Sequence, residues 1–106
     1  MTIDEFRNVD LRIVKVLAAE RVSGSDKLLK LMVSLGNEER QIIAGIGKSY
    51  EPEVLVGKEL VIVANLEPRT VMGLESQGML LAAGDSPETV TLIGPEHEVP
   101  PGLLLR

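Results

Sequence analysis

Apolar and polar side chains alternate along several short stretches of the chain, and this pattern predicts β-strands. The clearest stretch, residues 28–35, places one apolar set on a single face, namely Leu29, Leu31, Val33 and Leu35. Lys30 and Ser34 point the other way, as expected of a strand with one buried face. Gly36-Asn37 then opens a hairpin turn, and residues 40–46 form the return strand.

Residues 10–22 predict a longer strand that contains an irregularity. Leu11 and Ile13 occupy one phase of the alternation, but Val14 and Val16 occupy the other. A slip of one residue predicts a β-bulge or a sharp coil, because it moves the apolar set to the opposite face. The long first strand of a small closed barrel often needs such a bend.

Three further apolar stretches, residues 59–66, 78–83 and 89–93, predict additional strands. Residues 67–77 have the composition of a loop. Thr2 followed by Glu5 has the spacing of a capping box, so a short helix is expected at the N-terminus over residues 3–8.

A second short helix is expected between the return strand and residues 59–66. Ser49 can cap it, Pro52 is tolerated in its first turn, and Gly57 would stop it. The order is then strand, hairpin, short helix and further strands with turns at near-regular spacing. This order favours an all-β chain closed into a small barrel, and a helix after the third strand is the arrangement of the OB-fold.

The composition fits one ordinary globular domain. The chain has 106 residues, 44% hydrophobic and 25% charged, and no cysteine. Disulfides, thiolate metal sites and cysteine nucleophiles are therefore excluded. No apolar run approaches the roughly 18–20 residues that span a bilayer, and acids stand where a signal peptide carries lysine or arginine. We expect a cytoplasmic protein with no membrane partner.

The charge distribution limits the class of partner. The net charge is −5, which opposes long-range attraction to nucleic acid. Residues 1–48 are nevertheless near neutral, with eight Lys/Arg against seven Asp/Glu, so a local basic face is compatible with the sequence. Aromatic residues are limited to Phe6 and Tyr50. A platform for stacking single-stranded bases is therefore excluded, and any RNA affinity should depend on folded shape or on an apolar pocket.

The segment from Asn65 to Met79 is the first candidate site. Asn65 and Ser76 can donate and accept hydrogen bonds, Arg69 can grip a phosphate as a fork, and Met79 can offer a soft apolar contact to a base. Loops at barrel mouths collect binding residues. The structural alternative is that the glycines permit turns, Asn65 caps a strand end and Met79 is core.

The near-neutral half supplies the second candidate, a set of basic residues: Arg12, Lys15, Lys27, Lys30, Arg40 and Lys48. Lys27 and Lys30 flank one hairpin and could share a face. The alternative is an ordinary solvated surface.

Other features argue against chemistry and for a partner. Glu96-His97-Glu98 offers one histidine and two carboxylates on opposite sides of an extended chain, which is too few ligands for a metal site. No phosphate-binding glycine loop and no nucleophile elbow is present, so we expect no cofactor and no catalytic residue. The leucines at 103–105 must pack on their own barrel or across a twofold axis.

Four ordered blocks of sequence carry a family resemblance. They are Val9-Asp10-Leu11-Arg12; Gly24-Ser25-Asp26-Lys27-Leu28-Leu29-Lys30-Leu31 with Leu35-Gly36; Ala44-Gly45-Ile46 with Tyr50 and Leu55-Val56-Gly57-Lys58; and Ala64-Asn65-Leu66-Glu67-Pro68-Arg69 with Gly73, Ser76, Gly78-Met79 and Ala82-Ala83. This pattern resembles the tRNA-binding domain family from about residue 5 to the end. The turn at Gly24–Leu29 is similar to that of the C-terminal domain of methionyl-tRNA synthetases and of stand-alone tRNA-binding proteins.

The resemblance implies a five-stranded Greek-key OB barrel over residues 10–83 and an extension over 84–106 whose strands form a dimer interface, within one domain of residues 1–106. It implies binding to the folded L-shape of tRNA with little sequence preference. The implied RNA-binding residues are Lys27, Lys30, Asn65, Arg69, Ser76, Gly78 and Met79.

The resemblance also sets out partners and an alternative. It implies tRNA and a second copy of the chain as partners, and a synthetase catalytic domain that would lie elsewhere. Relatives often carry a second basic residue after the arginine, where this chain has Thr70. The acidic balance keeps a second hypothesis open, a chaperone-like or assembly module that uses the same fold for protein–protein contacts.

Overall fold

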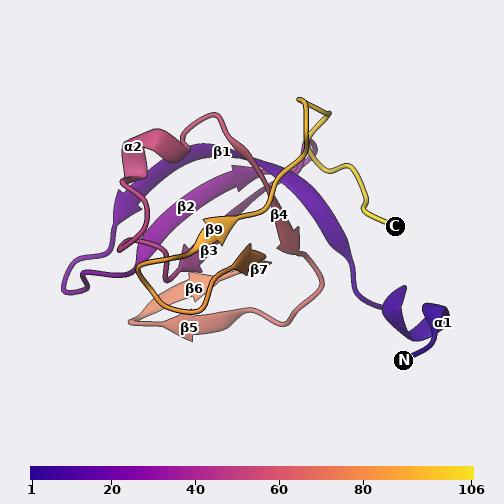
Figure 1. Cartoon of the computed structure of the whole chain (residues 1–106), viewed down its shortest axis with the longest axis horizontal. Helices are drawn as coiled ribbons and strands as arrows, with labels where there is room; N and C mark the ends of the chain where they lie inside the picture. The colour runs from indigo at the N-terminus through magenta and orange to yellow at the C-terminus, as the bar shows by residue number, and fades with distance from the viewer.

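Five antiparallel strands form one curled sheet in the computed structural model, which describes all 106 residues (Figure 1). The strands lie in the order β3-β2-β1-β4-β7. Their bounds are β1 Leu11–Arg21, β2 Leu29–Ser34, β3 Glu39–Ala44, β4 Glu59–Val63 and β7 Met79–Leu80. The predicted all-β class is confirmed, and the curled sheet is consistent with an OB-like fold.

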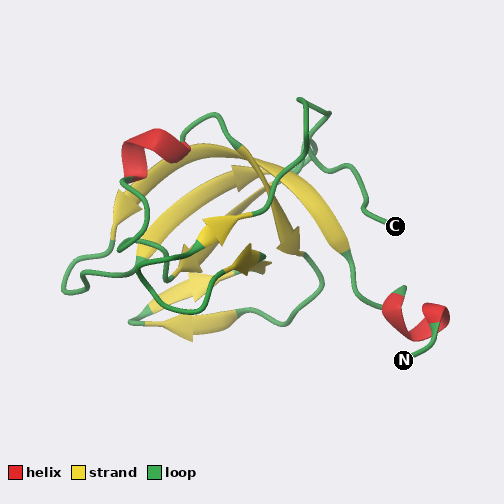
Figure 2. Ribbon diagram, in the orientation of Figure 1, coloured by secondary structure: helices red, strands yellow, loops and turns green.

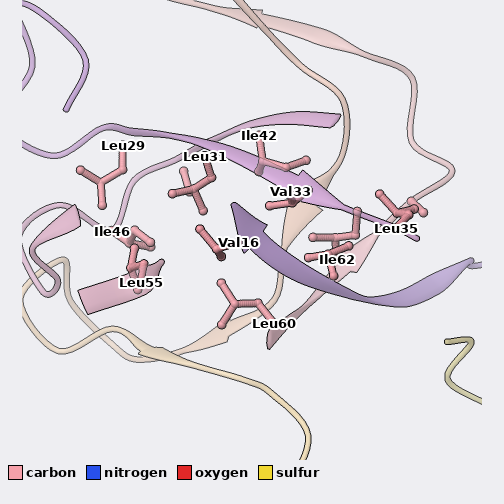
Figure 3. Packing of buried hydrophobic residues seen from close by; sticks show 13 residues of the cluster. Val16, Leu29, Leu31, Val33, Leu35, Ile42, Ile46, Leu55, Leu60 and Ile62 are labelled. Atoms are coloured by element: carbon pink, nitrogen blue, oxygen red, sulfur yellow. The ribbon is translucent and has the colours of Figure 1, made fainter. Parts of the chain in front are cut away.

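The concave side of the sheet encloses the core. In β2 the residues alternate between buried and half-buried, and Leu29, Leu31 and Val33 have no exposed surface. They pack with side chains from every other long strand, such as Val16, Ile42, Leu60 and Ile62 (Figure 3). Each fully buried Val, Leu or Ile contributes roughly 1.5–3 kcal/mol relative to exposure, so this cluster is the main source of stability.

Strand β1 contains the predicted irregularity. Its register against β2 shifts between Val16 and Ala18, which marks a β-bulge. The bulge lies beyond the slip seen in the sequence, where pairing with β4 is regular. The slip itself arises because both of its neighbours are buried: Val14 joins the core, whereas Ile13 lies outside that cluster. The strand thus has two covered faces in its first half.

The sheet closes by isolated hydrogen bonds instead of a continuous ladder. The free edge of β3 meets residues 76–78, where the N–H of Gln77 donates to the carbonyl of Gln41 at 2.8 Å. The N–H of Gln41 donates in return to Oε1 of Gln77 at 2.9 Å. Arg40 donates to the carbonyls of Ala64 and Gln77 and so joins β3 to the end of β4.

Both expected helices are present, and one of them starts elsewhere. Helix α1, Ile3–Phe6, has the complete capping box formed by Thr2 and Glu5. Helix α2, Pro52–Leu55, begins after Glu51, so the expectation that Ser49 caps it is wrong. The Ser49 hydroxyl is engaged elsewhere, donating to the carbonyl of Pro87 at 2.8 Å.

The predicted loop at residues 67–77 is mostly a β-hairpin. It consists of β5 Arg69–Val71 and β6 Leu74–Ser76, which pair antiparallel (Figure 2). Met72 and Gly73 form the turn with φ values of 49° and 80°. Two-residue hairpin turns usually contain Asn-Gly or Asp-Gly, so the sequence Met-Gly does not predict a hairpin.

The later strands are shorter than predicted. Residues 78–83 are divided into β7 and β8 Ala82–Ala83, and residues 89–93 contain only β9 Thr91–Leu92. Strands β8 and β9 pair with each other in a small separate sheet.

The C-terminal segment lies along the first half of β1. The N–H of Ile13 donates to the carbonyl of Leu103 at 2.9 Å, and the N–H of Gly102 donates to the carbonyl of Ile13 at 2.7 Å. Gly102 has a φ of 93°, and a Cβ there would clash with the carbonyl of Leu35. Leu103 and Leu104 remain about half exposed. None of the helices has the length and apolar character needed to cross a membrane.

Candidate nucleic-acid interface

The β5–β6 hairpin packs on the convex face of the sheet. A second apolar cluster of Val22, Leu28 and Ile43 lies there, and the partly buried Val71 and Leu74 of the hairpin cover it. Without the hairpin this cluster would face water. The same packing carries the hairpin turn to the turn that joins β1 and β2, because the Met72 Cε lies 3.7 Å from where a Cβ of Gly24 would stand.

One row of residues crosses these strands and joins the two candidate sites. Arg69 pairs with Ser76 across the hairpin, Ser76 bonds to Ile43, and Ile43 pairs with Lys30. The row therefore links Arg69 to Lys30, and Lys27 lies on the turn that precedes β2.

Ser76 and Gly78 lie inside the protein, beneath the surface that carries the basic residues. Ser76 is 1% exposed. Its hydroxyl accepts from the N–H of Ile43 at 2.9 Å and donates to the carbonyl of Gly78 at 3.1 Å. Gly78 has a φ of 144°, and a Cβ there would lie 3.0 Å from the carbonyl oxygen of Val63. Both residues fix the path of the chain between β6 and β7.

Asn65 joins the N-terminal segment to the end of β4. Its Oδ1 accepts from the N–H of Asp10 at 3.0 Å, and its Nδ2 donates to the carbonyl of Asn8 at 2.7 Å. The amide is thus occupied on both sides. This bonding matches the structural alternative for Asn65, in which it ties down a strand end.

Arg69 and Met79 are the open members of the segment. Arg69 is exposed and makes no ion pair, so its guanidinium is free to meet an anion. Met79 is 43% exposed, and the alternative that it belongs to the core is wrong. Both lie on strands whose backbones are paired, which limits their movement.

Most of the predicted basic residues are already paired with carboxylates. Lys30 contacts Glu20 at 2.7 Å, Lys15 contacts Glu98 at 3.4 Å, and Arg12, Arg40 and Lys48 also have acidic partners. Lys27 is the exception. It is exposed on a turn whose shape is set by the Ser25 hydroxyl, which accepts from the N–H groups of Lys27 and Leu28.

Five of the eleven lysines and arginines have no carboxylate within salt-bridge distance: Arg7, Lys27, Lys58, Arg69 and Arg106. Only Lys27 and Arg69 belong to the face described here. Sequence reasoning missed two neighbours of this face, Arg21 and Met72. Arg21 is the last residue of β1, directly before the turn that carries Lys27. This place in the sequence is the signal that could have identified it.

The acidic and histidine side chains do not gather into a metal-binding group. No group of three or more His, Cys, Asp or Glu side chains is arranged to hold a metal ion. Of the Glu96-His97-Glu98 run, Glu98 pairs with Lys15. Fold and surface together define a small module built on a curled five-stranded sheet, with exposed cations on the β1–β2 turn and on the β5–β6 hairpin.

The chain belongs to the tRNA-binding domain family. The family model described as "Putative tRNA binding domain" matches residues 11–103. Among curated relatives, the methionine–tRNA ligase of Thermotoga maritima is 58% identical over 102 residues, and that of Deinococcus radiodurans is 51% identical over 106 residues. These matches cover 96% and 100% of this chain but only 16% of each relative. The chain thus spans about a sixth of the curated relatives that it matches.

Solved structures agree with this assignment. A MetRS-related protein from Pyrococcus horikoshii superposes with a TM-score of 0.93 at 40% identity, covering 100% of this chain and 97% of the other. The chaperone CsaA from Bacillus anthracis superposes with a TM-score of 0.93 at 30% identity, covering 100% and 98%. In both cases, similarity extends over nearly the whole of each chain.

Proposed function

We propose that this chain binds tRNA without catalysing a reaction, either as the C-terminal module of a methionyl-tRNA synthetase or as a free-standing tRNA-binding protein. One observation supports the proposal most: in a chain of the tRNA-binding domain family, a row of contacts links the exposed Arg69, which has no ion pair, to Lys30, and the exposed Lys27 lies on the turn before Lys30. A synthetase catalytic domain would then be the partner that uses the bound tRNA.

Shape recognition suits the chemistry of this face. Lys27, Lys30 and Arg69 can each meet a phosphate, and phosphate contacts position a protein on RNA without reporting sequence. The chain lacks the aromatic rings on which unpaired bases usually stack. Because Lys30 is shared with Glu20 and the net charge is −5, the affinity should be moderate.

The predicted site residues divide into two roles under this proposal. Lys27, Lys30, Arg69 and Met79 contact the RNA, because their side chains reach the surface. Asn65, Ser76 and Gly78 hold the segment in place. The side chains of Asn65 and Ser76 form hydrogen bonds to the backbone, and a side chain at Gly78 would be too close to the Val63 carbonyl.

The test compares two charge reversals with equal effects on net charge. Lys27 and Lys58 are both exposed lysines without an acidic partner, and Lys58 lies outside the proposed face. Lys27→Glu should weaken binding of a tRNA transcript about tenfold, whereas Lys58→Glu should change it less than about twofold. The measurement is an equilibrium binding titration, with single-stranded RNA of equal length as competitor.

Two results would contradict the proposal. Equal effects of Lys27→Glu and Lys58→Glu would mean that only the overall charge matters. Absence of tRNA binding by the unaltered protein near physiological salt would remove the function itself.

The extension is proposed to serve dimerisation. Residues 10–83 would form the barrel and residues 84–106 the interface, within one domain. Leu103 and Leu104 are about half exposed on a segment that is held to β1, which is the pattern expected of an apolar surface that a second copy covers. Analytical ultracentrifugation should show a dimer, and Leu104→Glu should shift it to monomer.

A second candidate function rests on a separate observation. One similar solved structure is described as a chaperone, and the molecule is acidic overall. The chain could then act as a chaperone-like or assembly module. This candidate predicts suppression of aggregation of an unfolded client that is unaffected by Lys27→Glu.

A further inference from the structure

An open groove lies between the β1–β2 turn and the tip of the β5–β6 hairpin. It has a volume of about 400 Å³, and its lining consists of Glu20, Arg21, Val22, Ser23, Lys30, Met72 and Leu74. Val22 belongs to the second apolar cluster and Leu74 packs against it, while Arg21 and Lys30 are each paired with a carboxylate. The groove therefore offers apolar side chains beside two cations, Arg21 and Lys30, that an additional anion can share.

Met72 occupies this groove in an unusual backbone conformation. It is the only residue other than glycine with a positive φ, at 49°, and its side chain is 57% exposed. Gly or Asn suits this position better, because a side chain in the left-handed region meets steric resistance. The fold thus holds a large apolar side chain in water at a place where the turn itself favours a small residue.

Neither the positive φ of Met72 nor the exposure of its side chain adds to the stability of the fold. The terminal methyl of Met72 lies 3.7 Å from where a Cβ of Gly24 would stand. Val71 and Leu74 already cover the convex cluster. A large apolar side chain that is more than half exposed and strains its backbone is expected to serve contact with a partner.

We propose that this groove takes one unpaired nucleotide of the bound tRNA, with its base against Met72 and its phosphate toward Arg21 and Lys30, the two cations of the lining. The inference rests on the proposed tRNA binding and adds to it a site for an exposed base. A thioether is polarisable and adapts to an aromatic edge or face, so Met72 supplies the apolar contact that aromatic rings supply in other binders.

The charges at the groove support a nucleotide over an apolar peptide. Arg21 is held against Glu51 at 3.1 Å and Lys30 against Glu20 at 2.7 Å, while Lys27 is free on the adjoining turn. A phosphate can share Arg21 and Lys30 with their carboxylates, and Lys27 adds an unpaired positive charge on the adjoining turn. An uncharged peptide would leave the free lysine unused.

The central experiment separates a binding role of Met72 from a structural one. Met72→Gly removes the side chain and suits the positive φ, so the melting temperature should stay the same or rise. Its affinity for a tRNA transcript should nevertheless fall about three- to tenfold, the low end of the effect of losing a base contact. Met72→Leu, which retains apolar bulk, should bind within about twofold of the unaltered protein.

A second RNA tests for the unpaired base. A fully paired RNA duplex of similar length presents phosphates but no exposed base. Met72→Gly should bind this duplex as the unaltered protein does, whereas Lys27→Glu should weaken binding to both RNAs.

The outcomes distinguish the two proposals. If the unaltered protein binds tRNA and Met72→Gly binds it equally well, the nucleotide site is wrong and the tRNA-binding function stands. An equal loss on tRNA and duplex would also overturn the site. If the unaltered protein binds no tRNA, both proposals fall.

Discussion

Ser76 and Arg69 show how little a residue's type says about its role. Both are polar residues in one segment, and from the sequence both are candidates to contact RNA. The structure pairs them across the hairpin, yet Ser76 is buried against Ile43 whereas Arg69 is exposed. Which residue faces outward is decided by how the hairpin packs on the sheet, and the hairpin itself was not predicted.

Ser76→Ala should destabilise the protein. The substitution leaves the buried N–H of Ile43 without its acceptor and the carbonyl of Gly78 without its donor. Leaving a buried polar group unpaired costs about 1–3 kcal/mol, so the free energy of unfolding should fall by about that amount. Urea denaturation measures it. No loss of stability would show that water replaces the hydroxyl and that the bond is not structural.

Glu5 should titrate below the usual range. Its carboxylate accepts a hydrogen bond from the backbone N–H of Thr2 at 2.9 Å, and this bond, followed by the Thr2 side chain, lowers the pKa of Glu5 from the usual value of 4.5. The capping interaction is therefore fully present above pH 4.5 and is lost as the pH falls through the lower pKa of the folded state.

Thr2→Ala tests this linkage. It removes the hydroxyl that accepts from the N–H of Glu5, and the pKa of Glu5 should return toward 4.5 as the first turn frays. An NMR titration of the Glu5 side-chain carboxyl carbon follows the change. A Glu5 that titrates at 4.5 in the unaltered protein would contradict the capping box.

At the scale of elements, the sequence predicts best where burial is one-sided. Strand β2 alternates as expected because one face packs in the core and the other meets solvent. The β5–β6 hairpin and the short β8 and β9 strands escape prediction because each strand has only two or three residues, too few to show a period. Helix α2 begins at Pro52 because Ser49 is used to hold residues 87–90.

Gly102→Ala should release the C-terminal segment from β1. The added Cβ would clash with the Leu35 carbonyl, and the backbone has a positive φ. The N–H of Ile13, which donates to Leu103, should then exchange with solvent at least about tenfold faster, since overpacking of this kind costs roughly 1–3 kcal/mol. Hydrogen exchange measured by NMR reports this directly.

Gly45→Ala is the matched control for this experiment. Nothing lies within 4 Å of a Cβ at Gly45, and its φ is not positive, so exchange at Ile13 should stay unchanged. Equal behaviour of the two variants would show that the segment is not held by its fit against Leu35.

For the whole molecule, charge decides how tightly RNA is held. The proposed RNA-binding cations are only three, Lys27, Lys30 and Arg69, in a protein whose net charge is −5. Few phosphate contacts give a shallow dependence on salt, and three of them predict a slope of about −2 to −3 in a plot of log affinity against log salt concentration.

The salt titration is therefore a test of the size of the interface. Raising salt from 50 to 200 mM should weaken tRNA binding about 15- to 45-fold for each bound chain. A slope near −6 or steeper would require cations beyond this face. A slope near zero would indicate that uncharged contacts dominate.

Both ends of the chain lie together at one end of the molecule, and the loop joining β1 and β2 lies at the other (Figure 1). The molecule is 40 Å long in this direction. A tether, a fluorescent label or a solid support attached at either terminus would therefore leave the face that carries Lys27 and Met72 pointing away from the point of attachment. The two kinds of immobilised protein should bind ligands of that face equally well.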